Sequence, residues 1–326
     1  MGSTPQVERL VEGADRVMRV RNYSPRTRDT YRSWIRRFLV WSNRRNLHDL
    51  GRPDVELFVS HLARRDHVGP KTRNQAVSAL AFFFREILGR DELGTLPRAK
   101  EPKRIPVVLS HRQVMLVLAE LSGKYRLIAG LMYGAGLRLS EAHRLRVKDV
   151  DLDLMQISVV DGKGAKDRWV ILPERLVPAL NRQIDEVRVR HDQDQRRGAG
   201  WARLPNALAR KDPGAGYSLG QQFLFPASRE SSDPFTGRKG RAYLSHTATQ
   251  REVKRAGIAS GIPKPISCHT FRRSFATQML RSGYDVRTVQ KLMGHNDVRT
   301  TMIYVEAVTD AGTAMRSPLD QRKPRD

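Results

Sequence analysis

Six side chains in the last two thirds of this sequence form a set that could cut a phosphodiester bond. They are Arg138, Lys163, His269, Arg272, His295 and Tyr304. Arginine forks can each donate two parallel hydrogen bonds to phosphate oxygens. A tyrosine hydroxyl can attack phosphorus, while histidine and lysine can accept and deliver protons. Such a set requires no metal ion, and we predict neither a metal nor a cofactor.

The spacing of these residues adds to what their types suggest. His269 and Arg272 are three positions apart, so on a helix they share one face. Free N–H groups at the start of that helix would add to an anion site. Arg138 follows Gly134-Ala135-Gly136, a turn that can bring the backbone close to a ligand. Each short motif alone is weak and would better suit a helix surface, but their shared order upstream of Tyr304 favours a single site.

The composition indicates a soluble protein of about two domains with a polyanionic partner. The 326 residues are 39% hydrophobic and 29% charged, and no apolar stretch reaches membrane length. The net charge is +25, an excess that repels itself unless a partner such as nucleic acid relieves it. Charge alone leaves open a basic protein held to acidic surfaces without specificity.

The single cysteine, Cys268, excludes an intrachain disulfide and fits a reducing cytoplasm. Beside His269 it could be a thiol nucleophile, but we interpret it as a small buried residue. The N-terminus lacks the apolar core of a signal peptide, so no export is predicted.

Residues 1–97 are predicted to form a helical domain. Ser24-Pro25 places a capping hydroxyl before a proline at the first helical position. Apolar residues then recur at helical spacing over 31–39, and further helices are predicted after Pro53 and within 71–88. A linker over 98–109 follows, in which prolines and basic residues disfavour both helix and strand.

Residues 110–308 are predicted to form a second, mainly helical domain with a small antiparallel β-sheet. It opens with a capping-box pattern at 110–113. Helices are expected around 125–133 and 140–147, strands at 157–160 and 169–172 around a Gly-Lys-Gly turn, an insertion at about 200–244 and a tail at 309–326. The carboxylates of Asp149, Asp151 and Asp153 are interpreted as loop residues and not as a cation site.

Three motifs, a lysine and the final tyrosine resemble the conserved boxes of the tyrosine recombinases. The motifs are Gly136-Leu137-Arg138-Leu139-Ser140-Glu141, His269-Thr270-Phe271-Arg272 and Leu292-Met293-Gly294-His295, with Lys163 in the predicted turn and Tyr304 nine residues after His295. Arg273 stands where this family often has histidine, which leaves the attacking and phosphate-binding roles unchanged.

The resemblance implies a role for each of the six residues. The tyrosine would attack the scissile phosphorus and form a 3′-phosphotyrosine, while the two arginines and His295 would bind the non-bridging oxygens. His269 would help accept the tyrosine proton, and Lys163 would protonate the leaving 5′-oxygen. Lys166 is the alternative acid if Lys163 only contacts DNA.

The resemblance also implies architecture and partners. The helical domain would be a core-binding domain that closes with the catalytic domain as a C-shaped clamp on DNA. We expect a bacterial cytoplasmic protein, associated with the nucleoid when DNA-bound, that assembles as a tetramer on DNA, with its tail docked on a neighbouring copy. The expected DNA contacts beyond the catalytic set are Arg26, Lys71, Arg73, Lys103, Arg104, Lys166, Arg168, Phe223 and Pro234.

Within this family the sequence is most similar to integron integrases. The stretches 22–38 and 98–104 resemble that subgroup. His269 follows Lys163 by 106 positions (269 − 163), which leaves room for that subgroup's added segment. Phe223-Leu224-Phe225-Pro226 and Asp233-Pro234 resemble parts of it. There the segment holds extrahelical bases of folded single-stranded sites, although this chain lacks its usual tryptophans near Phe223 and its histidines near Tyr243.

The predicted function is therefore site-specific recombination through phosphotyrosine and Holliday-junction intermediates, with capture or excision of gene cassettes. Three alternatives remain. A phage- or transposon-type integrase would use the same residues on other sites. A type IB topoisomerase would relax supercoils without making a recombinant joint. A non-catalytic DNA-binding protein would have no need for the full catalytic set.

Overall fold

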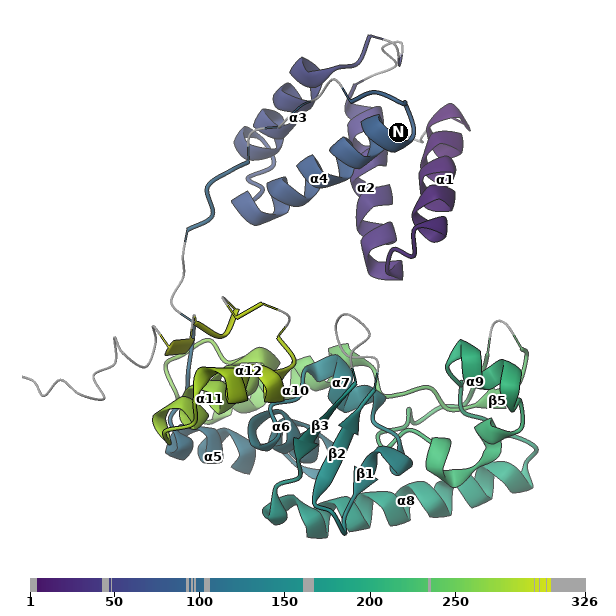
Figure 1. The fold of residues 1–326 in the computed structure, drawn as a ribbon, viewed down its shortest axis with the longest axis vertical. Coiled ribbons are helices and arrows are strands. Elements are labelled where there is room, and N and C mark those ends of the chain that lie inside the picture. The colour runs from purple at the N-terminus through teal and green to yellow at the C-terminus, as the bar shows by residue number, and fades with distance from the viewer. Residues whose placement is uncertain are drawn as a thin grey trace, which may run out of the picture. The chain divides into compact units, whose positions relative to one another are not determined.

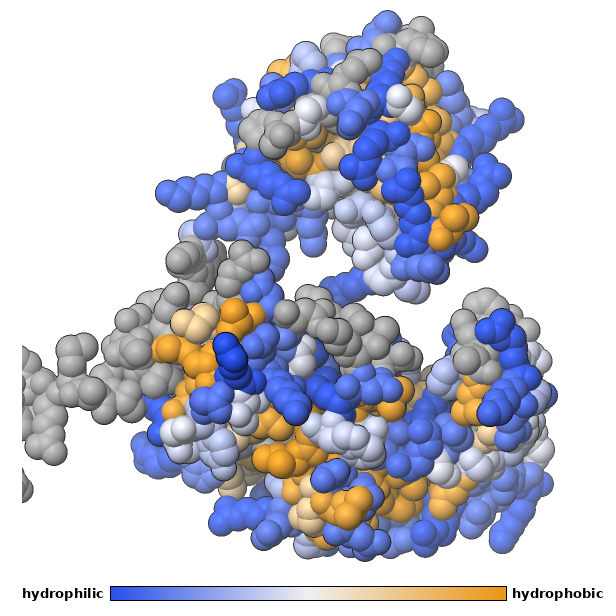
Figure 2. Space-filling view, viewed as in Figure 1, coloured by the Kyte–Doolittle hydropathy of each residue, from blue (hydrophilic) through white to orange (hydrophobic). Residues whose placement is uncertain are grey.

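The chain divides into two compact units, Met1–Arg104 and Ile105–Asp326 (Figure 1). Each unit has its own hydrophobic core. The computed structural model describes residues 5–42, 47, 49–91, 94, 96, 98–102, 106–160, 167–233, 236–295, 297–298, 300–302 and 304–305. On the face shown in Figure 2, hydrophilic residues cover most of both units.

The first unit is helical, as predicted. Its helices are α1 (Pro5–Val20), α2 (Pro25–Trp41), α3 (Arg52–Arg64) and α4 (Pro70–Glu86). The Ser24 hydroxyl accepts a hydrogen bond from the Thr27 amide at 3.2 Å, which confirms the predicted start of α2. Phe38 is fully buried, with its ring centroid 5.4 Å from that of Phe58 and 6.0 Å from that of Phe84. These aromatic contacts join α2, α3 and α4 in one core.

The side chain of Asn74 in α4 forms hydrogen bonds with the chain that follows this unit's helices. Its Nδ2 donates to the Ala99 carbonyl at 3.0 Å and to the Glu101 carboxylate at 2.9 Å, while its Oδ1 accepts from the Ala99 amide at 2.9 Å. The described start of the predicted linker, 98–102, is therefore bonded to α4.

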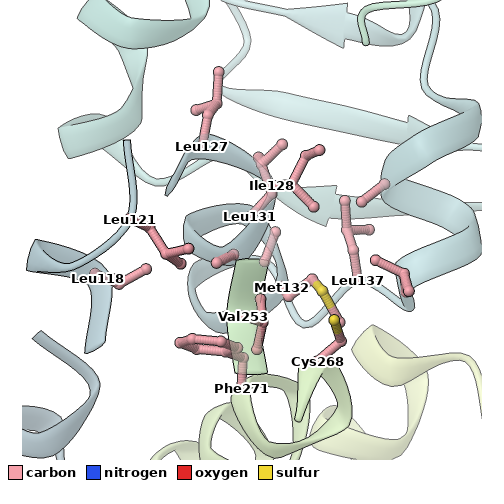
Figure 3. Close-up of a cluster of buried hydrophobic side chains, with 14 of the residues drawn as sticks. Leu118, Leu121, Leu127, Ile128, Leu131, Met132, Leu137, Val253, Cys268 and Phe271 are labelled. Carbon is pink, nitrogen blue, oxygen red and sulfur yellow. The ribbon is translucent and has the colours of Figure 1, made fainter. Parts of the chain in front are cut away.

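The second unit surrounds a central helix, α6 (Gly123–Gly134). Figure 3 shows Ile128, Leu131 and Met132 of α6 beside Val253 and Phe271. The other helices are α5 (His111–Ala119), α7 (Leu139–Arg144), α8 (Val177–Arg196), α9 (Asn206–Lys211), α10 (His246–Ala259), α11 (Cys268–Arg281) and α12 (Val286–Met293), with 3-10 turns η1 (Val147–Asp149), η2 (Glu174–Leu176), η3 (Ala215–Tyr217) and η4 (Leu219–Gln221).

The predicted capping box at the start of α5 is present, because Ser110 and Gln113 bond each other's backbone amides at 3.2 and 3.1 Å. Within the described residues, no helix combines the length and apolar character needed to cross a bilayer.

A three-stranded antiparallel sheet of order β1-β2-β3 lies beside these helices. The two predicted strands are β2 (Gln156–Val159) and β3 (Arg168–Ile171), and β1 (Val150–Asp151) is an addition to the prediction. Ile157 pairs with Val170, and both point into the core. The fold class is therefore as predicted: mainly helical with small antiparallel sheets.

The inserted segment at 200–244 has little regular structure but many internal bonds. Its only strands in the described part are β4 (Ser231–Ser232) and β5 (Lys239–Gly240). Gln222 donates from its amide to the carbonyls of Gly200 and Gly216, each at 3.0 Å. Arg146, which precedes η1, donates to the Gln221 carbonyl at 2.5 Å. The Gln222 bonds join parts of the segment to one another, and the Arg146 bond attaches the segment to the chain before η1.

Candidate active site

A pocket of about 330 Å³ in the second unit collects five of the six predicted catalytic residues. It is lined by Arg138, His269, Arg272, Arg273, His295, Asp297, Thr300 and Tyr304. These residues come from the turn between α6 and α7, from the start of α11 and from the chain after α12. The sixth residue, Lys163, lies outside the described residues, as does Lys166.

Arg138 is held in place by the carboxylate of Glu141. Its Nη1 donates to Glu141 Oε1 at 2.6 Å, and its backbone amide donates to Oε2 at 2.8 Å. Its Nη2 donates to the Gly294 carbonyl at 2.8 Å. The guanidinium is therefore held by two hydrogen bonds to different partners, one of which is to a charged carboxylate.

Arg272 is almost completely buried, with 4% of its surface exposed. It donates to the carbonyls of Gly136 and Met293, and its Nη1 lies 3.7 Å from Glu141. Burial, with the repulsion of Arg138, lowers the pKa of Arg272 to about 9. The guanidinium therefore stays charged at neutral pH, and two such cations at one pocket suit a phosphate.

Glu141 is the buried anion that balances these cations. Burial alone would raise the pKa of its carboxyl, but hydrogen bonds and charge from Arg168, followed by those from Arg138, lower it to about 2. Glu141 belongs to the motif that contains Arg138 and lies three residues after it on a short helix, a spacing that could have indicated an ion pair between the two. No role for it was predicted.

His295 and Tyr304 face each other at the pocket. Their rings are 6.2 Å apart at an interplanar angle of 24°. His295 Nδ1 shares a hydrogen bond with the Thr301 hydroxyl at 2.9 Å, and the His295 carbonyl accepts from Gln290 at 3.0 Å. Tyr304 packs among Phe275, Val289 and Met293 with 9% of its surface exposed. Packing and hydrogen bonds thus hold both rings.

His269 and Cys268 differ in what their surroundings allow. Burial, followed by the charges of Arg273, Arg272 and Arg138, lowers the pKa of His269. The imidazole is therefore neutral near pH 7 and can accept a proton. Burial raises the pKa of Cys268 to about 11, so the thiolate is scarce, in line with the predicted buried residue.

The other residues predicted to contact DNA are found in several settings. Arg26 and Lys71 are exposed, and Arg73 is half-buried, all in the first unit. Arg168 turns inward, with 10% of its side chain exposed and its guanidinium on Glu141; this placement argues against the predicted DNA contact. Phe223 is buried to 7% exposure, whereas Lys103, Arg104 and Pro234 lie outside the described residues.

A second pocket, of about 470 Å³, lies against the inserted segment. The rings of Phe223 and Tyr243 meet edge to face at 5.5 Å, and the Arg146 guanidinium lies 4.6 Å from the Phe223 ring centre. His246 stacks on Tyr243 at 5.7 Å. Gln221 lines this pocket, and its buried Oε1 has no hydrogen-bond partner among the described residues.

No group of three or more His, Cys, Asp or Glu side chains in the described part of the chain could hold a metal ion. A neutral histidine, two held arginines and a packed tyrosine form an anion pocket with a hydroxyl beside it. The fold and the pocket together define a class of protein that handles phosphodiesters.

Comparisons with known proteins identify the family. The model described as "Phage integrase family" matches residues 108–310, and that described as "Phage integrase, N-terminal SAM-like domain" matches residues 10–92. An "Integrase/recombinase" of Escherichia coli is 43% identical over 309 residues, which cover 94% of this chain and 92% of the relative. "Tyrosine recombinase XerA" of Thermococcus kodakarensis is 31% identical over 304 residues, 92% of each chain.

Solved structures share the fold at low sequence identity. A lambda integrase dimer bound to a core site matches with a TM-score of 0.65 at 16% identity, over 95% of this chain and 98% of that one. A XerH site-specific recombinase bound to palindromic difH substrate matches with a TM-score of 0.63 at 18% identity, over 94% and 82%. The chain belongs to the phage integrase family and is a site-specific tyrosine recombinase.

Proposed function

We propose that this recombinase cleaves DNA with Tyr304 and captures or excises gene cassettes of an integron. The observation that supports the chemistry most strongly is the pocket in which Arg138 and Arg272 lie with Tyr304. The tyrosine oxygen forms a bond to phosphorus while the bond from phosphorus to the 5′-oxygen breaks. The products are a 3′-phosphotyrosine and a 5′-hydroxyl.

Each pocket residue has a task in this step. Arg138, Arg272 and His295 donate hydrogen bonds to the non-bridging oxygens as charge develops on them. Neutral His269 accepts the proton of the Tyr304 hydroxyl, and Lys163 supplies a proton to the departing oxygen. Because the phosphotyrosine keeps the energy of the broken bond, attack by the 5′-hydroxyl of another strand reverses the step. Two rounds of exchange then proceed through a Holliday junction.

The pocket at the inserted segment supports the integron assignment. The half-buried Tyr243 ring at this pocket suits stacking on an unpaired base, with the buried Phe223 ring packed edge to face against it. His246 and Tyr243 provide aromatic surface close to where the integron subgroup has histidines. Folded single-stranded sites would therefore be substrates beside duplex DNA.

The proposed partners follow from the same assignment. DNA lies on the first unit through Arg26, Lys71 and Arg73, and four copies assemble on two sites. Lys103, Arg104, Lys166 and Pro234 complete the proposed DNA contacts, and the tail at 309–326 docks on a neighbouring copy. The proposed location is the bacterial cytoplasm, at the nucleoid when bound to DNA.

Tyr304→Phe tests the chemistry. The variant loses only the hydroxyl, so DNA binding should persist while the covalent adduct on a nicked suicide substrate disappears from denaturing gels. An adduct formed by the variant would assign the nucleophile to another residue.

Sequencing of recombinant joints tests the integron assignment against the phage- or transposon-type alternative. Cells would carry the recombinase, candidate integron sites and a random site library. Joints at hairpin-forming cassette sites are expected, and they should decrease in Phe223→Ala while cleavage of a duplex site is retained. Joints only at duplex library sites would favour the alternative.

A further inference from the structure

Three consecutive carbonyls at the C-terminal end of α12 each accept a hydrogen bond from a different arginine. Arg168 Nε donates to Leu292 at 2.9 Å, Arg272 donates to Met293, and Arg138 Nη2 donates to Gly294 at 2.8 Å. The last carbonyls of a helix lack partners within the helix and carry partial negative charge. The helix end is therefore a common anchor for three arginines from three separate segments.

Of these arginines, Arg168 does not line the pocket. It is the first residue of β3. Its Nη1 donates to Glu141 Oε1 at 3.1 Å and its Nη2 donates to Glu141 Oε2 at 2.8 Å. The same carboxylate bonds Arg138 and lies 3.7 Å from Arg272. Because the Arg168 fork is planar and bidentate, it fixes the plane of the carboxylate and thereby the direction in which Glu141 presents its oxygens to Arg138.

The backbone at Gly294 is shaped to accept Arg168. Gly294 ends α12 in the left-handed conformation with φ of 58°. A Cβ atom at this position would lie 3.0 Å from Arg168 Nη1 and 3.1 Å from its Cζ. The guanidinium thus packs directly against the Gly294 backbone, one residue before His295. A displaced Arg168 would disturb Glu141 on one side and the backbone that leads to His295 on the other.

We infer that Arg168 is a positioning residue of the cleavage reaction. It holds Glu141 and the end of α12 so that Arg138 and Arg272 present their remaining N–H groups to the scissile phosphate, and it does not contact DNA itself. The inference rests on the proposed roles of Arg138 and Arg272.

Arg168→Met in the full chain tests the inference by single-turnover cleavage of a nicked duplex substrate. With saturating DNA, cleavage is expected to slow about 10²-fold, the effect of a displacement of about 1 Å at reacting groups. DNA affinity and its dependence on salt should not change. Arg168→Lys keeps the charge but loses the fork, so its cleavage rate should lie between those of the wild type and Arg168→Met.

Arg241→Met is the matched control. Arg241 has 11% of its side chain exposed. Its Nε and Nη2 donate to the two oxygens of the buried Asp194 carboxylate at 2.6 and 2.9 Å. It does not line the candidate active site. The control should lose stability as Arg168→Met does but cleave duplex DNA at the wild-type rate. Equal slowing in both variants would reduce Arg168 to a general stabilising role and overturn the inference.

A bridging 5′-phosphorothiolate substrate separates positioning of the arginines from delivery of the proton. Sulfur is a good leaving group without a proton, but it does not replace charge stabilisation on the non-bridging oxygens. Arg168→Met should therefore remain slow on this substrate. Rescue by sulfur would mean that Arg168 acts through the general acid. A slope of log DNA affinity against log salt concentration that is smaller by about 1 in the variant would mean that Arg168 contacts a DNA phosphate directly. Either result overturns the inference.

The pH profile gives an independent check. Arg168 contributes most to lowering the pKa of Glu141, so in Arg168→Met this pKa rises and the carboxylate protonates as the pH falls. Wild-type cleavage declines on the acid side as His269 becomes protonated, and the variant should decline further there because Glu141 is protonated as well; identical profiles would count against the inference. An adduct formed by Tyr304→Phe would instead refute the proposed function, whatever the behaviour of Arg168.

Discussion

Replacement of Glu141 by glutamine measures how much the buried carboxylate stabilises the second unit. Folding lowers the pKa of Glu141 from its usual 4.5 to about 2. Each pKa unit corresponds to about 1.36 kcal/mol, so the ionised carboxylate contributes about 3 kcal/mol at neutral pH. Removal of one partner of a buried ion pair costs a similar ~3–5 kcal/mol. We therefore expect Glu141→Gln to destabilise the second unit by about 3 kcal/mol at pH 7.

The sign of the pH dependence follows from the direction of this shift. Because the folded state has the lower pKa, the contribution is complete above about pH 4.5 and is lost as the pH falls through about 2. At pH 3 the difference between wild type and variant should be roughly half its value at pH 7.

Urea unfolding at both pH values, read by hydrogen exchange of peptides from each unit, supplies the measurement. The first unit lacks Glu141 and serves as an internal reference. Glu174→Gln, which changes an exposed glutamate, should shift stability by less than about 0.5 kcal/mol. A Glu141→Gln variant as stable as this control, or a difference that does not change between pH 7 and pH 3, would refute the reasoning.

Three further predictions concern the backbone at Gly136, the proposed general acid Lys163 and the salt dependence of DNA binding. Gly136→Ala should destabilise the second unit by about 2–4 kcal/mol, because φ is +67° and the new Cβ would lie 2.5 Å from Phe275. Gly198→Ala is the control: its φ is +73° and nothing lies within 4 Å of the new Cβ. It should show only the backbone cost of about 1–2 kcal/mol in the same urea assay. Lys163→Ala should cleave ordinary DNA slowly and a 5′-phosphorothiolate substrate almost normally, and sulfur rescue of Lys166→Ala alone would reverse the assignment. The logarithm of DNA affinity should fall linearly and steeply with the logarithm of salt concentration, and a nearly flat plot would contradict extensive phosphate contact.

Local sequence patterns predicted much of the fold. The Ser24 cap, the capping box at Ser110 and the two strands around the Gly-Lys-Gly turn depend on residues close in sequence, and the structure contains each of them. Helix α1 was not predicted, since its buried Val11, Ala14 and Met18 form a short stripe among charged residues. Strand β1 has two residues, too few for an alternation pattern.

The sequence predicted which residues form the candidate site but not the ion pairs and hydrogen bonds that hold them in place. Motif spacing indicated Arg138 and Arg272, whereas the ion pair between Glu141 and Arg168 joins residues 27 positions apart, and Arg272 meets Met293 over 21 positions. A single sequence carries no signal for such pairs. On a chain with net charge +25, an arginine near a predicted DNA-binding turn favours a DNA contact, so the inward direction of Arg168 was not foreseen.

The bonds from Asn74 to Ala99 and Glu101 determine where this recombinase can be divided for engineering. A hybrid that exchanges the first unit for that of a relative has to take residues 98–102 together with α4, because a junction before Ala99 would remove the partners of a half-buried amide. A junction beyond Glu101 keeps each hydrophobic core and this hydrogen-bonded segment intact. Libraries that aim at new target sites would therefore place their crossovers after this point and leave the anion pocket of the second unit unaltered.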